Sequence, residues 1–302
     1  MQTDSPITPE FWENEWRSAI DRAPTRRRAT DKEAVKMNRW NKMAADFAEN
    51  TGGPKREAER RAVIQRLMAQ NALRPGAAVL DIGAGPGSWT CMLAETVGHV
   101  TALEPADGMA DIMKNRIATD NIDNITIDRR TWQSVDLDAD GWRGKFDLVF
   151  ASMTPGIDGP ESLLKMMAAS RDACYLSAFS GSNWRSQYAD LWQTFFNEPI
   201  GEQPGDIIYP LNLVYAMGFR PSLEFAYWTR KQSMNREKAV ERFTLFFETY
   251  MPMTEGVKTV ITDHVNQRCV DGRYTDARDV CRGMMIWNIA QHRSAARPKE
   301  AP

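Results

Sequence analysis

The chain lacks long apolar runs, a strong excess of charge and any signal for export. None of its 302 residues lies in an apolar stretch long enough to span a bilayer, and the first residues lack the charged-then-apolar pattern of a signal peptide. A formal net charge of −2 gives no general attraction to nucleic acid or to an anionic membrane. We therefore expect a cytoplasmic protein with no nucleic-acid partner and no membrane partner.

Residues that bind metals or form disulfides are also scarce. The four cysteines, Cys91, Cys174, Cys269 and Cys281, are scattered, without a C-x-x-C pair or neighbouring histidine ligands. There are only 3 histidines. We expect neither a disulfide nor a metal site, and no pair of residues with the spacing of a catalytic acid and base is apparent.

A glycine-rich segment at residues 79–89 organises the rest of the chain. It reads as an apolar strand, a turn with glycines at 83, 85 and 87, and the start of a helix. Strands and helices alternate after it, which predicts a parallel sheet. In the dinucleotide fingerprint G-x-G-x-x-G the third glycine would stand at Ser88. The pattern therefore disfavours an NAD(P)-dependent oxidoreductase, which stays an alternative.

Two carboxylates complete the pattern around the glycines. Asp81 precedes the turn, and Glu104 ends the next strand, residues 100–103. A strand, D-x-G-x-G-x-G and a carboxylate at the end of the following strand together resemble the class I S-adenosylmethionine-dependent methyltransferases. The resemblance implies a Rossmann-like, seven-stranded, mostly parallel α/β sheet sandwiched by helices, with S-adenosylmethionine as cofactor. Glycine suits this site because it lets the backbone approach the cofactor closely.

The resemblance also assigns candidate site residues. Glu104 would accept hydrogen bonds from the ribose hydroxyls, and residues 132–133, after the third strand, would flank the adenine. The full set for cofactor binding is Asp81, Gly83, Ala84, Gly85, Gly87, Glu104, Pro105, Trp132, Gln133, Ala151 and Ser152. The set for substrate binding is Trp40, Met153, Tyr188 and Trp192. Each of the four aromatic residues in these sets has a plain alternative, which is to fill a hydrophobic core.

The domain plan predicted from the sequence places helices around the central fold. By the resemblance, residues 1–55 are expected to form an N-terminal helical lid, and residues 56–302 a methyltransferase domain with cap insertions at about 181–206 and 229–279. The sixth and last strands are predicted at residues 223–228 and 281–288. The roughly fifty residues between these strands greatly exceed an ordinary connection, so a folded helical cap is expected there.

The predicted reaction is methyl transfer to a small molecule by in-line displacement. Aromatic caps and near-neutral charge favour an enclosed apolar site. The fourth strand ends in Ser-Met-Thr-Pro-Gly, whereas methyltransferases acting on base or amide nitrogens often carry Asn/Asp-Pro-Pro-aromatic, so those acceptors are disfavoured. A protein methyltransferase and a non-catalytic S-adenosylmethionine-binding protein remain alternatives, beside the oxidoreductase.

Overall fold

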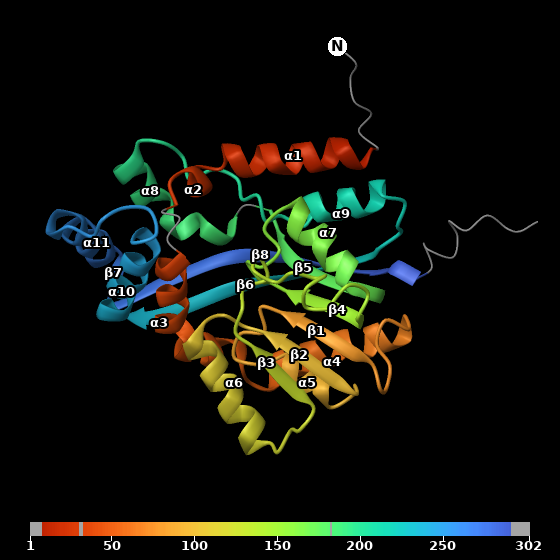
Figure 1. Cartoon of the computed structure of the whole chain (residues 1–302). Coiled ribbons are helices and arrows are strands. Elements are labelled where there is room, and N and C mark those ends of the chain that lie inside the picture. The colour runs from red at the N-terminus through yellow and green to blue at the C-terminus, as the bar shows by residue number, and fades with distance from the viewer. Residues whose placement is uncertain (1–7, 30–32, 182, 291–302) are drawn as a thin grey trace, which may run out of the picture.

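The computed structural model describes residues 8–29, 33–181 and 183–290, and the fold is built on one twisted sheet (Figure 1). Seven strands lie in the order β3 (Ile125–Asp128), β2 (His99–Leu103), β1 (Ala78–Ile82), β4 (Phe146–Ser152), β5 (Ser170–Ser180), β8 (Arg273–Asn288) and β6 (Ser222–Asn235). The first five strands are mutually parallel, and β8 is antiparallel to both of its neighbours. The predicted Rossmann-like, mostly parallel sheet is confirmed.

Helices cover both faces of the sheet (Figure 1). One face packs against Trp16, Leu163 and Leu213, and the other against Leu67, Leu93 and their neighbours. The helices on the first face are α1 (Pro9–Arg22), α7 (Pro160–Ala169) and α9 (Ile208–Ala216), and those on the second are α4 (Pro54–Ala69), α5 (Thr90–Ala94) and α6 (Asp107–Thr119). A short helix, α2 (Pro24–Arg27), follows α1. Among the described helices, none combines the length and the apolar character needed to cross a membrane.

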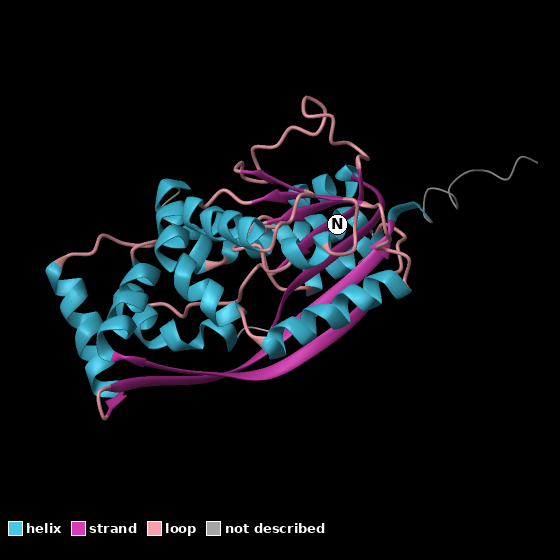
Figure 2. Ribbon diagram, turned by 90° about the horizontal axis from the view of Figure 1, so that it is seen from below, coloured by secondary structure: helices cyan, strands magenta, loops and turns pink. Residues whose placement is uncertain are grey.

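The strands β6 and β8 are much longer than predicted. They pair without interruption from Ser222 opposite Ile286 to Asn235 opposite Arg273, and this ribbon continues well beyond the sheet (Figure 2). The predicted strand bounds of 223–228 and 281–288 are therefore wrong. The added segments alternate between inward and exposed positions, but several inward positions are polar, among them Arg230 and Gln232. Because the inward side is not apolar, the period-two hydrophobic pattern disappears there.

The far end of the ribbon carries a separate helical unit with its own core. We call it the cap: residues 183–196, with η1 (Asn183–Tyr188) and α8 (Ala189–Phe196), and residues 236–270, with α10 (Arg236–Phe247), α11 (Glu255–Arg268) and β7 (Cys269–Val270). Tyr188 stacks on Phe246 with 3.6 Å between ring centroids, and Trp192 is completely buried. The two segments inserted into the sheet fold thus pack into one cluster.

Asp147, at the start of β4, fixes the edge of the sheet opposite to the glycine turn. Its side chain is 2% exposed and accepts hydrogen bonds from the Ala78 N–H at 2.8 Å, from Arg74 at 2.7 Å and from Arg171 at 2.7 Å. Burial acts to raise the pKa of Asp147, but Arg171 and the Ala78 N–H hold it below its ordinary value. The ionised carboxylate therefore stabilises the fold.

We expect Asp147→Asn to lower the free energy of unfolding by about 1–3 kcal/mol at neutral pH. Since the folded pKa lies below the unfolded one, the stabilisation is complete above an unfolded pKa of about 3.9 and is lost as the pH falls through the folded value. Urea unfolding at pH 7 and at successively lower pH measures this. If the stability difference between Asp147→Asn and wild type did not shrink at low pH, the stabilising role of the ionised carboxylate would be contradicted.

Candidate functional site

The glycine turn after β1 is held open by backbone geometry that suits glycine. Gly83, Gly85 and Gly87 have φ values of +71°, +59° and +79°. A Cβ on Gly87 would lie 2.6 Å from Met113 Cγ, and one on Gly83 would collide with Thr154, so both glycines are required by packing. A Cβ on Gly85 would meet only Phe47, at 3.9 Å. The middle glycine therefore borders open space beneath the N-terminal helix α3 (Glu33–Thr51).

Glu104 joins this turn to the next strand and helix. Its Oε2 accepts a hydrogen bond from the Gly85 N–H and its Oε1 one from the Ala106 N–H, both at 2.8 Å. The residue is 7% exposed, and burial raises its pKa although the two N–H donors oppose the rise. Each oxygen keeps lone pairs that no protein group uses, so the carboxylate can still accept hydrogen bonds from a ligand.

Asp81 is the second buried carboxylate at this turn. It is 1% exposed and accepts a hydrogen bond from the Thr90 hydroxyl at 2.7 Å. Burial raises its pKa to about 7, and the nearby negative charge of Glu104 adds to the rise against the opposing bond from Thr90. Asp81 thus fixes the start of α5 instead of facing solvent.

Helix α3 covers the glycine turn and links it to the cap (Figure 1). Asn41 Oδ1 accepts a hydrogen bond from the Gly108 N–H at 2.9 Å, and Trp40 packs on the cluster around Ala106 at the start of α6. On its other side Asp46 pairs with Lys238 of α10 at 2.7 Å. Trp40 thus packs α3 onto the start of α6, and its role in substrate binding stays a prediction.

The carboxyl end of β4 is strained and polar. Ser152 Oγ lies 3.0 Å from Ser177 Oγ on β5, and the Met153 N–H donates to the Ser177 carbonyl at 2.8 Å. Met153 has a φ of +54°, a left-handed conformation that costs free energy for a residue with a side chain. Strain at this strand end is consistent with a functional role for Met153.

The loop after β3 reaches the same edge through one of its two candidate residues. Gln133 Nε2 donates to the Gly156 carbonyl at 3.2 Å. Trp132 is 2% exposed, lies in the main core, and donates its indole N–H to the Ser162 carbonyl at 3.0 Å. Lys165 Nζ covers its ring, 4.7 Å from the centroid. This placement favours the core alternative for Trp132.

Two aromatic candidates for the acceptor side lie within the core of the cap. Trp192 is fully buried there, and Tyr188 is sandwiched by the phenylalanines of α10. The Tyr188 hydroxyl accepts a hydrogen bond from Arg242 Nε at 3.4 Å. Burial acts to raise the pKa of Tyr188, but the charge of Arg242 holds it below its ordinary value. The structure therefore favours packing as the role of both rings.

Some contributors to the site were not predicted. Phe47 faces Gly85, Thr90 bonds Asp81, and Ser177 bonds both residues at the end of β4. No sequence spacing distinguishes these residues from ordinary core or turn positions, because it is the fold that brings each one to its partner. Among the described residues, no group of histidine, cysteine and acidic side chains is placed to hold a metal ion.

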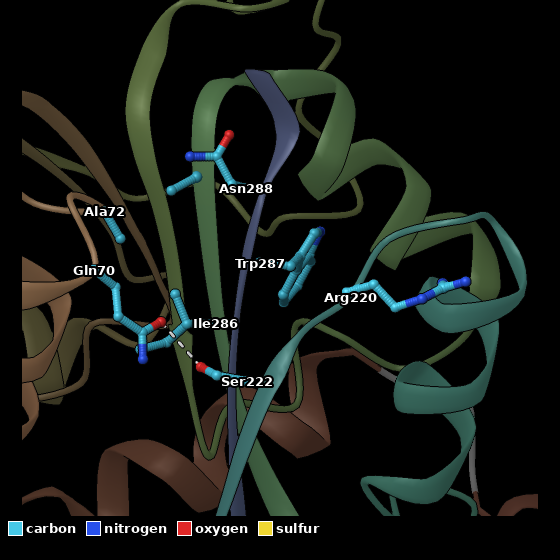
Figure 3. Close-up of a pocket in the computed structure, with 8 residues that line it drawn as sticks. Gln70, Ala72, Arg220, Ser222, Ile286, Trp287 and Asn288 are labelled. Carbon is cyan, nitrogen blue, oxygen red and sulfur yellow. Dashed lines mark hydrogen bonds between the residues drawn. The ribbon is translucent and has the colours of Figure 1, made fainter. Parts of the chain in front are cut away.

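A small pocket elsewhere on the sheet is separate from this site. It lies between the end of α4 and the amino ends of β5 and β6, lined by Gln70, Arg220, Asn288 and their neighbours (Figure 3). Gln70 and Ser222 are hydrogen-bonded across it at 2.9 Å. Ligands of open α/β sheets bind at the carboxyl ends of the parallel strands. This pocket is at the opposite edge.

Comparison with known proteins finds similarity over the glycine turn and the segment that follows it. Residues 79–172 match a family model described as a methyltransferase domain. Among solved structures, magnesium protoporphyrin IX methyltransferase from Synechocystis PCC 6803, with bound S-adenosylhomocysteine, superposes with a TM-score of 0.52 at 13% identity, covering 85% of this chain and 99% of that one. At this identity the likeness establishes the fold.

Two curated relatives show how far sequence similarity extends. An uncharacterised protein of Haemophilus influenzae is 27% identical over 190 residues, which are 62% of this chain and 65% of that protein. Protein-L-isoaspartate O-methyltransferase of Saccharophagus degradans is 35% identical over 92 residues, 30% of this chain and 38% of that enzyme. The chain thus matches less than two thirds of the length of either relative.

We expect Asp81→Asn to raise the free energy of unfolding by a few kcal/mol, roughly, at pH 8. The folded pKa of about 7 lies above the unfolded one, so ionisation of Asp81 is costly in the fold and stability is lost as the pH rises toward that value. Asparagine cannot ionise, yet it can still accept the Thr90 bond. Urea unfolding of both proteins at pH 8 and near pH 4 measures the difference between their free energies of unfolding. This difference is expected to vanish at the lower pH. A variant less stable than wild type at pH 8 would show that the charge is compensated.

Proposed function

We propose that this protein transfers a methyl group from S-adenosylmethionine to a small-molecule acceptor, since residues 79–172 match a family model described as a methyltransferase domain and the sheet has the Rossmann-like fold. The observation that carries the proposal is the position of Glu104. Its carboxylate stands at the carboxyl end of β2, bound to the N–H of Gly85 in the middle of the glycine turn. That is where the ribose of an adenosine cofactor would be held.

The residues present fit this cofactor. Gly85 faces open space, so an amino-acid group could approach the backbone there without meeting a side chain other than Phe47. Glu104 keeps the acceptor capacity that two ribose hydroxyls need. The turn lacks the third glycine of a pyrophosphate cradle and carries Ser88 in its place. S-adenosylmethionine, which has no phosphate, matches this arrangement better than NAD(P) does.

The protein's part in such a reaction is mainly alignment and exclusion of water. A sulfonium cofactor supplies an activated methyl group and leaves as a neutral thioether, so no acid is needed for the leaving group. The end of β4, with Ser152 and Met153, would position the acceptor, and α3 would cover the glycine turn. A base is required only when the acceptor arrives protonated.

The connection between α3 and the cap supports an acceptor of limited size. Lys238 of α10 pairs with Asp46 of α3 at 2.7 Å, and Lys42 lies 4.0 Å from Glu248. The Arg39 guanidinium covers the Phe246 ring at 5.8 Å from its centroid. These contacts hold α3 against the cap, which favours a small acceptor over a protein chain.

We expect Glu104→Gln to weaken binding of S-adenosylhomocysteine at least tenfold, which corresponds to about 1.4 kcal/mol. The amide keeps the size of the side chain but offers one acceptor oxygen instead of two, and that oxygen carries no charge. Isothermal titration measures the change. Glu95→Gln is the matched control, because Glu95 is half-exposed on the surface and, within the described part of the chain, bonds only Arg61.

Equal affinity in the Glu104 and Glu95 variants would contradict the cofactor site. The acceptor class is tested separately by incubating the protein with methyl-labelled S-adenosylmethionine and a cell extract, then dividing the products by size. Label is expected in the small-molecule fraction. Label confined to the protein fraction would establish a protein acceptor instead.

A further inference from the structure

The inward face of the ribbon carries an unusual concentration of arginine. Strand alternation places Trp228, Arg230 and Gln232 of β6 on this face, opposite Val280, Arg278 and Asp276 of β8, with Arg282 next along β8. Arg230 and Arg278 are therefore direct cross-strand neighbours of like charge, an arrangement that destabilises a sheet. Arg242 of α10 approaches from the cap and bonds Gln232 at 2.5 Å. We call Arg230, Arg242, Arg278 and Arg282 the arginine cluster.

Very little negative charge offsets this cluster. Among the described residues, the one carboxylate that contacts it is Asp276, which binds Arg278 at 2.6 Å. Arg278 is 8% exposed, and its buried Nε–H has no protein partner in the described part of the chain; the same holds for the Nε–H of Arg282. Burial lowers the pKa of Arg230 to about 10, and the charges of Arg278 and Arg242 add to the effect.

The cluster lies on the acceptor side of the candidate site. Arg282 pairs in register with Phe179 of β5, two residues past Ser177, whose hydroxyl contacts Ser152 at the end of β4. Its guanidinium covers the Trp228 ring at 5.9 Å from the centroid, and Arg56 of α4 covers the same ring at 5.4 Å. The inward face of the ribbon thus leads from the carboxyl edge of the sheet toward the cap.

We propose that the methyl acceptor is an anion, and that the arginine cluster binds its carboxylate or phosphate group. This inference rests on the proposed methyl transfer, because it assigns the substrate class of the same site. Guanidinium groups bind both kinds of oxyanion through paired N–H donors. An anion would supply the missing acceptors for the Nε–H groups of Arg278 and Arg282 and would offset the repulsion between Arg230 and Arg278.

Packing alone does not account for the cluster. Arginine stems often cover apolar surface, but their charged ends then reach water or pair with carboxylates. Here buried N–H groups lack partners among the described residues, and two arginines stand directly opposite each other on paired strands. Such an arrangement costs stability in the free protein and is typical of a site that a ligand completes.

The test compares Arg230→Gln with Lys231→Gln in the full chain. Lys231 is the next residue, exposed on the outer face of the same ribbon, and serves as the matched control. Thermal unfolding is followed in inorganic phosphate and in citrate, with sodium chloride at equal ionic strength as reference. Wild type and Lys231→Gln are expected to gain stability with either anion, and Arg230→Gln to need at least tenfold more anion for the same shift.

Without added anion, Arg230→Gln is expected to unfold at the same temperature as wild type or a higher one, because the substitution removes a like-charge pair. Arg282→Gln provides a second variant that removes charge from the same cluster, and the same loss of anion response is expected. The relative strength of phosphate and citrate shows which of the two groups the site prefers.

An equal response of wild type and both arginine variants, or a wild-type response no larger than that to sodium chloride, would overturn the proposal. Titration with S-adenosylhomocysteine separates this failure from failure of the proposed function. If S-adenosylhomocysteine binds normally but neither anion stabilises the protein, only the proposal of an anionic acceptor is wrong. If the anions stabilise the protein but S-adenosylhomocysteine does not bind, the proposed methyl transfer is wrong and the arginine cluster is still an anion site.

Discussion

The candidate site depends on the pair of hydrogen bonds that Glu104 accepts from the Gly85 and Ala106 N–H groups. These bonds join three elements that meet at the carboxyl edge of the sheet: the glycine turn after β1, the end of β2 and the start of α6. A buried carboxylate without such donors would be costly, so the two N–H groups are what keep a charge at this position. The same carboxylate is the group proposed to bind the ribose of the cofactor.

Buried charge is distributed unevenly across the two parts of the site. Asp81 and Glu104 place two carboxyl groups at the glycine turn, and burial raises the pKa of each. The ribbon gathers positive charge on its inward face, where Arg230 lies beside Arg278. A cofactor with a sulfonium and an acceptor with an acidic group would each meet charge of the opposite sign. Electrostatics would then orient both partners before transfer.

The central fold could be predicted from the sequence because its signals are local. The apolar strand before Asp81, the glycine turn and the alternation after Glu104 each fall within short windows, and the observed strand order confirms the fold class. The length of the ribbon could not be predicted, because Arg230 and Gln232 make its inward face polar. The sequence left the roles of Trp132 and Tyr188 open between core packing and the site, since the choice depends on partners such as Ser162 and Phe246 far away in the chain.

The most direct test is a calorimetric titration of the whole protein with S-adenosylmethionine, S-adenosylhomocysteine and NADH. The glycine turn and Glu104 are expected to bind the first two compounds, whose adenosine and amino-acid groups match the open turn. NADH is not expected to bind, because the turn lacks the third glycine that a pyrophosphate needs. Binding of NADH with no binding of either adenosyl compound would contradict the assignment of this site to methyl transfer.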